Sequence, residues 1–153
     1  MTTRWARLRA VTLRDLPTLL LCVVLVPVIS GSVRAKGMQW TADHLAKRSN
    51  RASGRPDFGR AALMSETVAV AAKLTPIPVR CLPRSLTLWF LLRRRGMDAD
   101  LVIGALPPRG RGLVAHSWVE LDGRPLNDQP DIRERFGSFG AILPGLLPGS
   151  TSS

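Results

Sequence analysis

The sequence contains no tyrosine, and its few phenylalanines and tryptophans make up only 5% of 153 residues. Acidic side chains are also scarce. The sequence has 11 of them and 22 lysines and arginines, which gives a formal net charge of +11. With so few aromatic rings, and with the arginines spread along the whole chain, a surface on which nucleobases stack is not expected. We therefore expect no nucleic-acid partner, which leaves an acidic peptide or an anionic membrane as the partner that this charge suits.

Cysteine is nearly absent as well. Cys22 and Cys81 have neither the spacing of metal ligands nor a disulfide framework around them, so we expect a reduced, cytoplasmic protein. The sequence shows no internal repeat, and its length suits one ordinary domain that needs no metal or disulfide to fold. We expect this chain to bind no cofactor itself.

An apolar run at residues 16–29 follows a basic N-terminus. The run contains Pro17 and Pro27 and is shorter than the roughly 20 residues that a membrane span requires. We predict a packed or surface-lying amphipathic helix in which Cys22 is a small buried hydrophobic residue. Three alternatives stay open: a signal peptide, peripheral membrane contact through residues 16–29, and an incorrectly assigned start codon.

Helical patterns continue through the first half of the chain. Residues 37–47 predict a short helix with Trp40 and His44 on one face, where local packing is the expected role of both. Residues 49–59 are rich in Arg, Ser, Gly, Pro and Asp, which is typical of a solvated connection. Residues 61–74 return to helical periodicity.

The most informative stretch is RCLPRSLTLWFLLRRRG at residues 80–96. Pro83 suits the first turn of a helix, so we predict that the helix begins there and that Cys81 lies at its positive end, which favours a thiolate. Three arginines at 93–95 complement the negative end, and Gly96 is a typical left-handed stop. The residues between are apolar on most sides, which indicates a central, buried helix.

Extended structure is predicted after this helix. Residues 99–105 are short, apolar and β-branched, as in a buried strand, and residues 114–121 alternate in polarity. The dipeptide at 122–123, Asp-Gly, predicts a hairpin turn, from which residues 124–128 return as the partner strand. Beyond it we expect a helical turn at 131–136, with Phe136 and Phe139 packed against the sheet.

Three residues in these elements form a candidate catalytic set: Cys81, His116 and Asp128. Each alone is more often structural, as a core thiol, a hydrogen-bonded strand histidine or a turn aspartate. Their order on a helix, a strand and the next strand is shared by cysteine peptidases, transglutaminases and arylamine acyltransferases. In such a set the histidine takes the thiol proton and the aspartate orients the imidazole.

The hairpin register tests this hypothesis. If residues 121–123 form a three-residue loop, His116 lies opposite Asp128; if 122–123 alone form the loop, His116 lies opposite Gln129 and Asp128 turns to the other face. The catalytic hypothesis therefore predicts the longer, bulged loop.

Two motifs contain the candidate residues, CLPRSLTLWFLLRRRGMDADLVIG at 81–104 and AHSWVELDGRPLND at 115–128, and Phe136 follows them. Together they closely resemble the lasso-peptide biosynthesis B proteins, which are transglutaminase-like cysteine peptidases that remove the leader from a ribosomally made precursor. The resemblance spans about residues 61–139. It implies that the three candidates are nucleophile, base and orienting acid; Ser117 stands where many relatives carry alanine.

The resemblance implies an α+β fold of papain or transglutaminase type, in which the cysteine-bearing helix packs on a small antiparallel sheet with extra N-terminal helices. We expect a helical segment and linker at 1–59, the peptidase core at 60–140 and a flexible tail at 141–153. A leader-recognition domain is not apparent in the first sixty residues, so the chain resembles the split, protease-only form. It is then expected to work on the precursor peptide with a separate recognition protein and an ATP-using, asparagine-synthetase-like cyclase, either of which could dock on the N-terminal segment.

Two other functions compete with leader removal. The same three residues could catalyse another acyl transfer, such as transglutamination, in which an amine replaces water. Alternatively, the chain could be a non-enzymatic basic module that binds a partner or a membrane.

Overall fold

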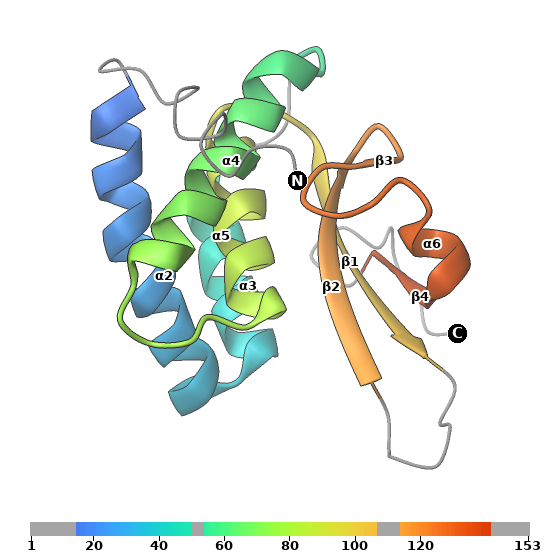
Figure 1. Cartoon of the computed structure of the whole chain (residues 1–153), viewed down its shortest axis with the longest axis horizontal. Helices are drawn as coiled ribbons and strands as arrows, with labels where there is room; N and C mark the ends of the chain where they lie inside the picture. The colour runs from blue at the N-terminus through green and yellow to red at the C-terminus, as the bar shows by residue number, and fades with distance from the viewer. Residues whose placement is uncertain (1–14, 50–53, 107–113, 142–153) are drawn as a thin grey trace, which may run out of the picture.

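The computed structural model of this chain describes residues 15–49, 54–106 and 114–141. Figure 1 shows α2, α3, α4 and α5 gathered beside one face of a small sheet, with α6 on the sheet's other side. This arrangement confirms the α+β prediction. Within the described residues the elements are α2 (Leu16–Lys36), α3 (Met38–Arg48), α4 (Phe58–Leu74), α5 (Cys81–Arg94), β1 (Ala99–Leu106), β2 (Val114–Leu121), β3 (Arg124–Pro125), α6 (Ile132–Arg135) and β4 (Gly137–Ala141).

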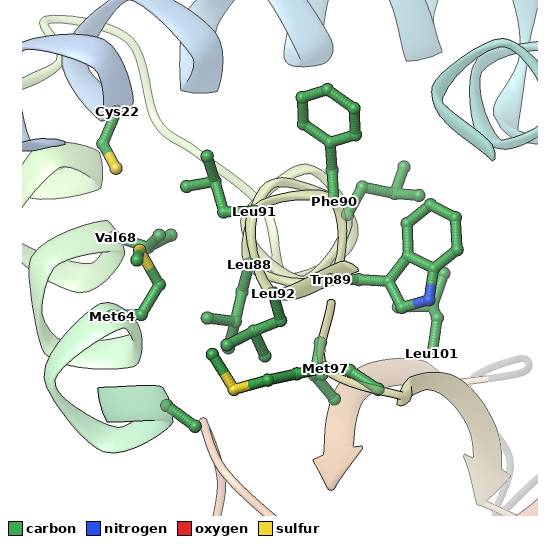
Figure 2. Packing of buried hydrophobic residues seen from close by; sticks show 14 of the residues in the cluster. Cys22, Met64, Val68, Leu88, Trp89, Phe90, Leu91, Leu92, Met97 and Leu101 are labelled. Atoms are coloured by element: carbon green, nitrogen blue, oxygen red, sulfur yellow. The ribbon is translucent and has the colours of Figure 1, made fainter. Parts of the chain in front are cut away.

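Helix α5 lies at the centre of the core, as its composition predicts. Figure 2 views this helix end-on, and its apolar side chains leave it in nearly every direction. Leu88 and Leu92 are fully buried and Trp89 is nearly so, which places helix α5 between the other helices and the sheet. The helix begins at Cys81, two residues before the predicted start, because Pro83 is also tolerated within the first turn, where backbone N–H groups lack partners.

The end of α5 is a Schellman motif. Gly96 has a φ of +78°, its N–H donates to the carbonyl of Arg93 at 2.9 Å, and the N–H of Met97 donates to the carbonyl of Leu92 at 3.1 Å. Met97 is buried beneath the turn. The predicted glycine stop is confirmed, and the turn directs the chain into β1.

Helix α2 is longer than the apolar run that predicted it. It continues past residue 29 to Lys36 and accommodates Pro27, so it is long and apolar enough to cross a membrane by length and composition. The prediction that this segment is too short was therefore wrong, although core helices of soluble proteins and signal sequences meet the same criterion. Cys22 and Val26 are fully buried in the main core, which confirms the prediction for Cys22. The opposite side exposes the stripe Leu20, Val24 and Val28.

The next two helices match their predicted patterns closely. In α3 the rings of Trp40 and His44 stack with centroids 4.8 Å apart, which is the local packing that their spacing predicts. Helix α4 starts at Phe58, where the side chain of Asp57 caps it by accepting a hydrogen bond from the N–H of Arg60 at 2.9 Å.

The sheet is antiparallel, with the strand order β3-β2-β1-β4. Val119 and Leu121 of β2 belong to the core that contains α5, and the alternate residue Trp118 packs with Ile132 of α6 and with Phe136 on the opposite face. The predicted packing of Phe136 is confirmed. The side chain of Phe139 and the predicted tail beyond residue 141 lie outside the described residues.

A buried carboxylate fastens α6 to the sheet. Glu120 is only 1% exposed, and its Oε1 accepts hydrogen bonds from Trp118 Nε1 and from Arg133 Nε, each at 2.7 Å. A second nitrogen of Arg133 donates to Oε2 of Glu120. Burial alone would raise the pKa of Glu120, but these hydrogen bonds and the positive charge of Arg133 lower it, so the carboxylate is ionised.

Candidate active site

Cys81 is the first residue of α5. Its thiol is free and partly exposed, and its backbone N–H lies at a helix start, where it needs no carbonyl partner in the helix. Among the interactions of the described residues, the thiol makes no hydrogen bond. Cys81 therefore combines an accessible sulfur with an adjacent N–H donor at the positive end of a helix dipole.

His116 and Asp128 form a direct pair. The distance from Nε2 of His116 to Oδ2 of Asp128 is 2.5 Å, and the ring centroid of His116 lies 5.2 Å from that of Phe136. Asp128 also accepts a hydrogen bond from the backbone N–H of Gln129 through Oδ1, at 2.9 Å. These contacts fix the imidazole from two sides.

The charge state of Asp128 determines the tautomer of the histidine. Burial of Asp128 would raise its pKa, but hydrogen bonds from His116 and the Gln129 N–H, together with the positive charges of the protonated form of His116 and of Arg84, lower it. An ionised carboxylate only accepts hydrogen bonds, so Nε2 of His116 carries the proton. Nδ1 is then the nitrogen of the neutral ring that can accept a proton from another group.

The hairpin does not have the predicted loop. Leu121 pairs with Arg124 and Glu120 with Pro125, so 122–123 is a two-residue loop, and the prediction of a three-residue bulged loop was wrong. Asp122 and Gly123 have φ values of +50° and +72°, the left-handed conformations that an Asp-Gly type I′ turn uses. By register alone this loop would turn Asp128 away from His116.

The pair forms because regular pairing stops after two residues of β3. The N–H of Leu126 still donates to the carbonyl of Val119 at 2.9 Å, but the N–H of Val119 donates to the side-chain Oδ1 of Asn127 at 2.8 Å. A side chain thus takes the place of a backbone carbonyl, and the chain leaves the strand path before Asp128. The register rule no longer applies at residue 128.

Asn127 also ties this segment to the cysteine-bearing helix. Its Nδ2 donates to Oγ of Ser85 at 3.0 Å, and that hydroxyl donates to the carbonyl of Ser117 at 3.0 Å. Ser85 is fully buried in the first turns of α5. One network therefore connects the helix of Cys81, the strand of His116 and the segment of Asp128. Asn127 was not identified from the sequence. The signal that could have identified it is its position, because an amide side chain lies there between the proline of a short edge strand and the candidate aspartate.

A pocket of about 780 Å³ brings Cys81 and His116 together on its wall, beside Ile103 of β1 and Ser117 of β2. It lies at the part of β2 that β3 leaves unpaired, because β3 covers only Glu120 and Leu121. Asp128 and Arg84 line a neighbouring pocket of about 660 Å³. All three predicted residues thus lie around one region of the molecule.

Neither pocket suggests a metal centre. In the part of the chain that the structure describes, no three His, Cys, Asp or Glu side chains are grouped so that they could hold a metal ion.

The sequence matches the family model of the transglutaminase-like superfamily over residues 23–139. The chain belongs to the transglutaminase-like superfamily. The matched region starts within α2 and includes all three predicted site residues, so most of α2 and all of α3 lie within the superfamily match together with α5 and most of the sheet.

This transglutaminase-like chain is also similar to the microcin J25-processing protein McjB of Escherichia coli. The two are 29% identical over 113 residues, which cover 74% of this chain and 52% of McjB. This similarity supports the resemblance to lasso-peptide B proteins that the two sequence motifs indicate. The chain spans about half the length of this curated relative, and no solved structure matches it.

Proposed function

We propose that this protein is a cysteine peptidase that removes the leader from a ribosomally made lasso-peptide precursor. The observation that carries the proposal is the 2.5 Å contact between His116 and Asp128, next to a pocket that Cys81 and His116 both line. The similarity to a microcin-processing protein supports the choice of substrate.

The first half of the proposed reaction forms an acyl-enzyme. Nδ1 of His116 takes the proton of the Cys81 thiol, and the thiolate attacks the carbonyl carbon of the last leader residue. The carbonyl oxygen becomes an oxyanion, which the backbone N–H of Cys81 stabilises at the start of α5. The imidazolium then gives its proton to the leaving nitrogen, the C–N bond breaks, and the core peptide departs with a free amino group.

The second half returns the enzyme to its starting state. A water molecule loses a proton to Nδ1 of His116 and attacks the thioester carbonyl, which forms a second oxyanion. The C–S bond breaks, the sulfur regains its proton from the imidazolium, and the leader leaves as a carboxylic acid. Asp128 stays ionised throughout, holding the tautomer and stabilising the imidazolium.

The proposal includes two partner proteins. A separate recognition protein brings the leader to this chain, and an ATP-using, asparagine-synthetase-like cyclase joins the freed amino group to a side chain of the core. The released amine is the product that such a cyclase consumes, so leader removal precedes ring closure.

Mass spectrometry of a lasso-peptide precursor incubated with this protein, with and without the recognition protein, tests the proposal. We expect one cleavage by the wild type, none by Cys81→Ala or His116→Ala, and a rate for Asp128→Asn lowered by about 10² to 10⁴. Cys22→Ala is the matched control, because it removes the other thiol, which is buried away from the pocket. Full cleavage by Cys81→Ala would reject the mechanism, and no cleavage by the wild type would favour a non-enzymatic role.

A transglutaminase-like acyl transfer is the second candidate, favoured by the superfamily match. Both reactions share the thioester and differ only in the group that resolves it. Adding methylamine to the reaction distinguishes them, because an acyl transferase produces a leader methylamide whereas a peptidase in water produces the leader acid.

A further inference from the structure

The pocket that contains Cys81 and His116 has a wall built by the N-terminal helices. Val33 of α2 and Met38 of α3 line it together with Ile103 of β1. More than half of the lining residues are apolar and none is acidic. We infer that this wall is a specificity site for an apolar residue of the substrate next to the bond that is cut. The inference rests on the proposed function, since it takes the thiol as the point where that bond lies.

The corner between α2 and α3 holds this wall in a fixed shape. Gly37 has a φ of +85°, a conformation that favours glycine, and its N–H donates to the carbonyl of Val33 at 3.1 Å. The hydroxyl of Thr41 donates to the carbonyl of Gly37 at 2.8 Å and lies 2.9 Å from Oγ of Ser32. The two lining residues flank this corner, so their positions are set before a substrate arrives.

Ser117 supplies an independent sign of a ligand. Its side chain is 2% exposed, its Oγ has no hydrogen-bond partner, and it lines the same pocket. Buried hydroxyls are nearly always paired, so an orphan that faces a pocket points to a partner that binds there. An extended peptide that places its apolar side chain against Met38 offers backbone N–H and C=O groups to this hydroxyl.

The charge and the volume of the pocket further limit which substrate residue can occupy it. Arg34 and Arg80 also line the pocket, so a cationic substrate side chain is disfavoured there. The volume of about 780 Å³ lies within the range of pockets that enclose a small ligand, which leaves room for a side chain together with its neighbouring backbone. The chemistry therefore matches a neutral apolar residue in a peptide, held by its backbone at Ser117.

The test uses two series of precursor peptides. In each peptide, one of the four residues around the junction between leader and core is replaced by leucine or by asparagine. Asparagine has a shape similar to that of leucine but is polar. At one position we expect the wild type to prefer leucine by at least about tenfold in kcat/KM. The double variant Val33→Thr, Met38→Gln makes the wall polar and lowers that ratio about tenfold. Met38→Leu keeps the wall apolar and retains the ratio.

Val28→Thr is the matched control, since Val28 lies on the same helix but is exposed and away from the pocket. Ser117→Ala lowers kcat/KM for the leucine and asparagine peptides alike, because it removes a bond to substrate backbone. Equal kcat/KM values for both peptides at all four positions would overturn the inference. So would a double variant that slows both peptides equally.

A binding measurement separates this inference from the proposed function. The affinity of the Cys81→Ala protein for the same peptides, measured by calorimetry, reports on the wall without any cleavage. If the wild type cuts nothing, the peptidase proposal fails, but a leucine preference in binding that Val33→Thr, Met38→Gln abolishes still supports the specificity site. Equal affinities for the leucine and asparagine peptides would overturn it.

Discussion

Asn127 accepts a hydrogen bond from the backbone N–H of Val119, at 2.8 Å, where a continued strand would present the carbonyl of Leu126. That carbonyl instead accepts a hydrogen bond from Oγ of Ser65 on α4, at 3.2 Å. The exchange ends β3 after two residues and directs Asp128 to His116.

Asn127→Ala should therefore lower both stability and activity. It leaves the N–H of the buried residue Val119 without an acceptor, so we expect the free energy of unfolding to fall by about 1 to 3 kcal/mol in urea denaturation. It also frees the segment of Asp128, so kcat should fall more than KM rises. Gln129→Ala, at an exposed neighbouring side chain, is the control and should change stability by less than about 0.5 kcal/mol. Equal losses in the two variants would show that the amide does not position Asp128.

Asp128→Asn should show a pH-dependent effect on stability. Because the pKa of Asp128 is lowered in the folded state, the unfolded chain binds the proton more readily as the pH falls. The stabilisation is fully present above the ordinary pKa of about 4 and is lost as the pH drops through the lower folded-state pKa. Urea denaturation from pH 7 to pH 3 should show the wild type losing its advantage over Asp128→Asn at the acid end. A constant difference down to pH 3 would contradict an ionised, hydrogen-bonded Asp128.

Arg133→Ala should be more destabilising than Glu120→Gln. Removing the guanidinium leaves a carboxylate that is 1% exposed without its charge partner, which should cost about 3 kcal/mol in the free energy of unfolding. Glu120→Gln removes the buried charge and keeps an oxygen that can accept from Trp118 Nε1, so its cost should be smaller. In thermal denaturation, adding Glu120→Gln to Arg133→Ala should recover part of the loss. A double variant less stable than Arg133→Ala alone would argue against a buried charge at this position.

The two cysteines should differ sharply in their reaction with iodoacetamide. Burial raises the pKa of Cys22 to about 11, against a smaller opposing effect of the Arg95 charge, and its side chain is not exposed to solvent. Cys81 is partly exposed at a helix start. In the native protein at pH 7.5 we expect labelling of Cys81 alone, with Cys22 labelled only after unfolding. Peptide mapping by mass spectrometry checks this, and native labelling of Cys22 in a Cys81→Ala background would contradict the buried core position of α2.

Sequence patterns predicted most of the helices and strands because these patterns reflect interactions between residues that are close together in the chain. The glycine after three arginines predicted the end of α5, and alternation along β2 predicted which side chains share a face. The error at the hairpin has a physical cause. The rule that opposed residues keep a constant register assumes an unbroken ladder, and the side chain of Asn127 breaks that ladder.

The N-terminal segment shows a second limit of prediction from the sequence. An apolar run with two prolines gave no indication of which face would be covered, because that depends on the surfaces that α4 and α5 present. In the structure Cys22 and Val26 join their core, and Val33 lines the same pocket as Cys81. The segment thus contributes to the candidate site itself.

The sequence by itself determined that a cysteine lies at or just before the start of an apolar helix, that a histidine lies on an alternating strand and that an aspartate follows the hairpin, since helix starts, strand periodicity and Asp-Gly turns depend on neighbouring residues. Only the tertiary structure decided that the histidine and aspartate meet and that the cysteine and the histidine line one pocket. Those contacts join residues that are not neighbours along the chain, and they depend on one half-buried amide that replaces a backbone carbonyl and on a helix corner that lines the pocket of Cys81.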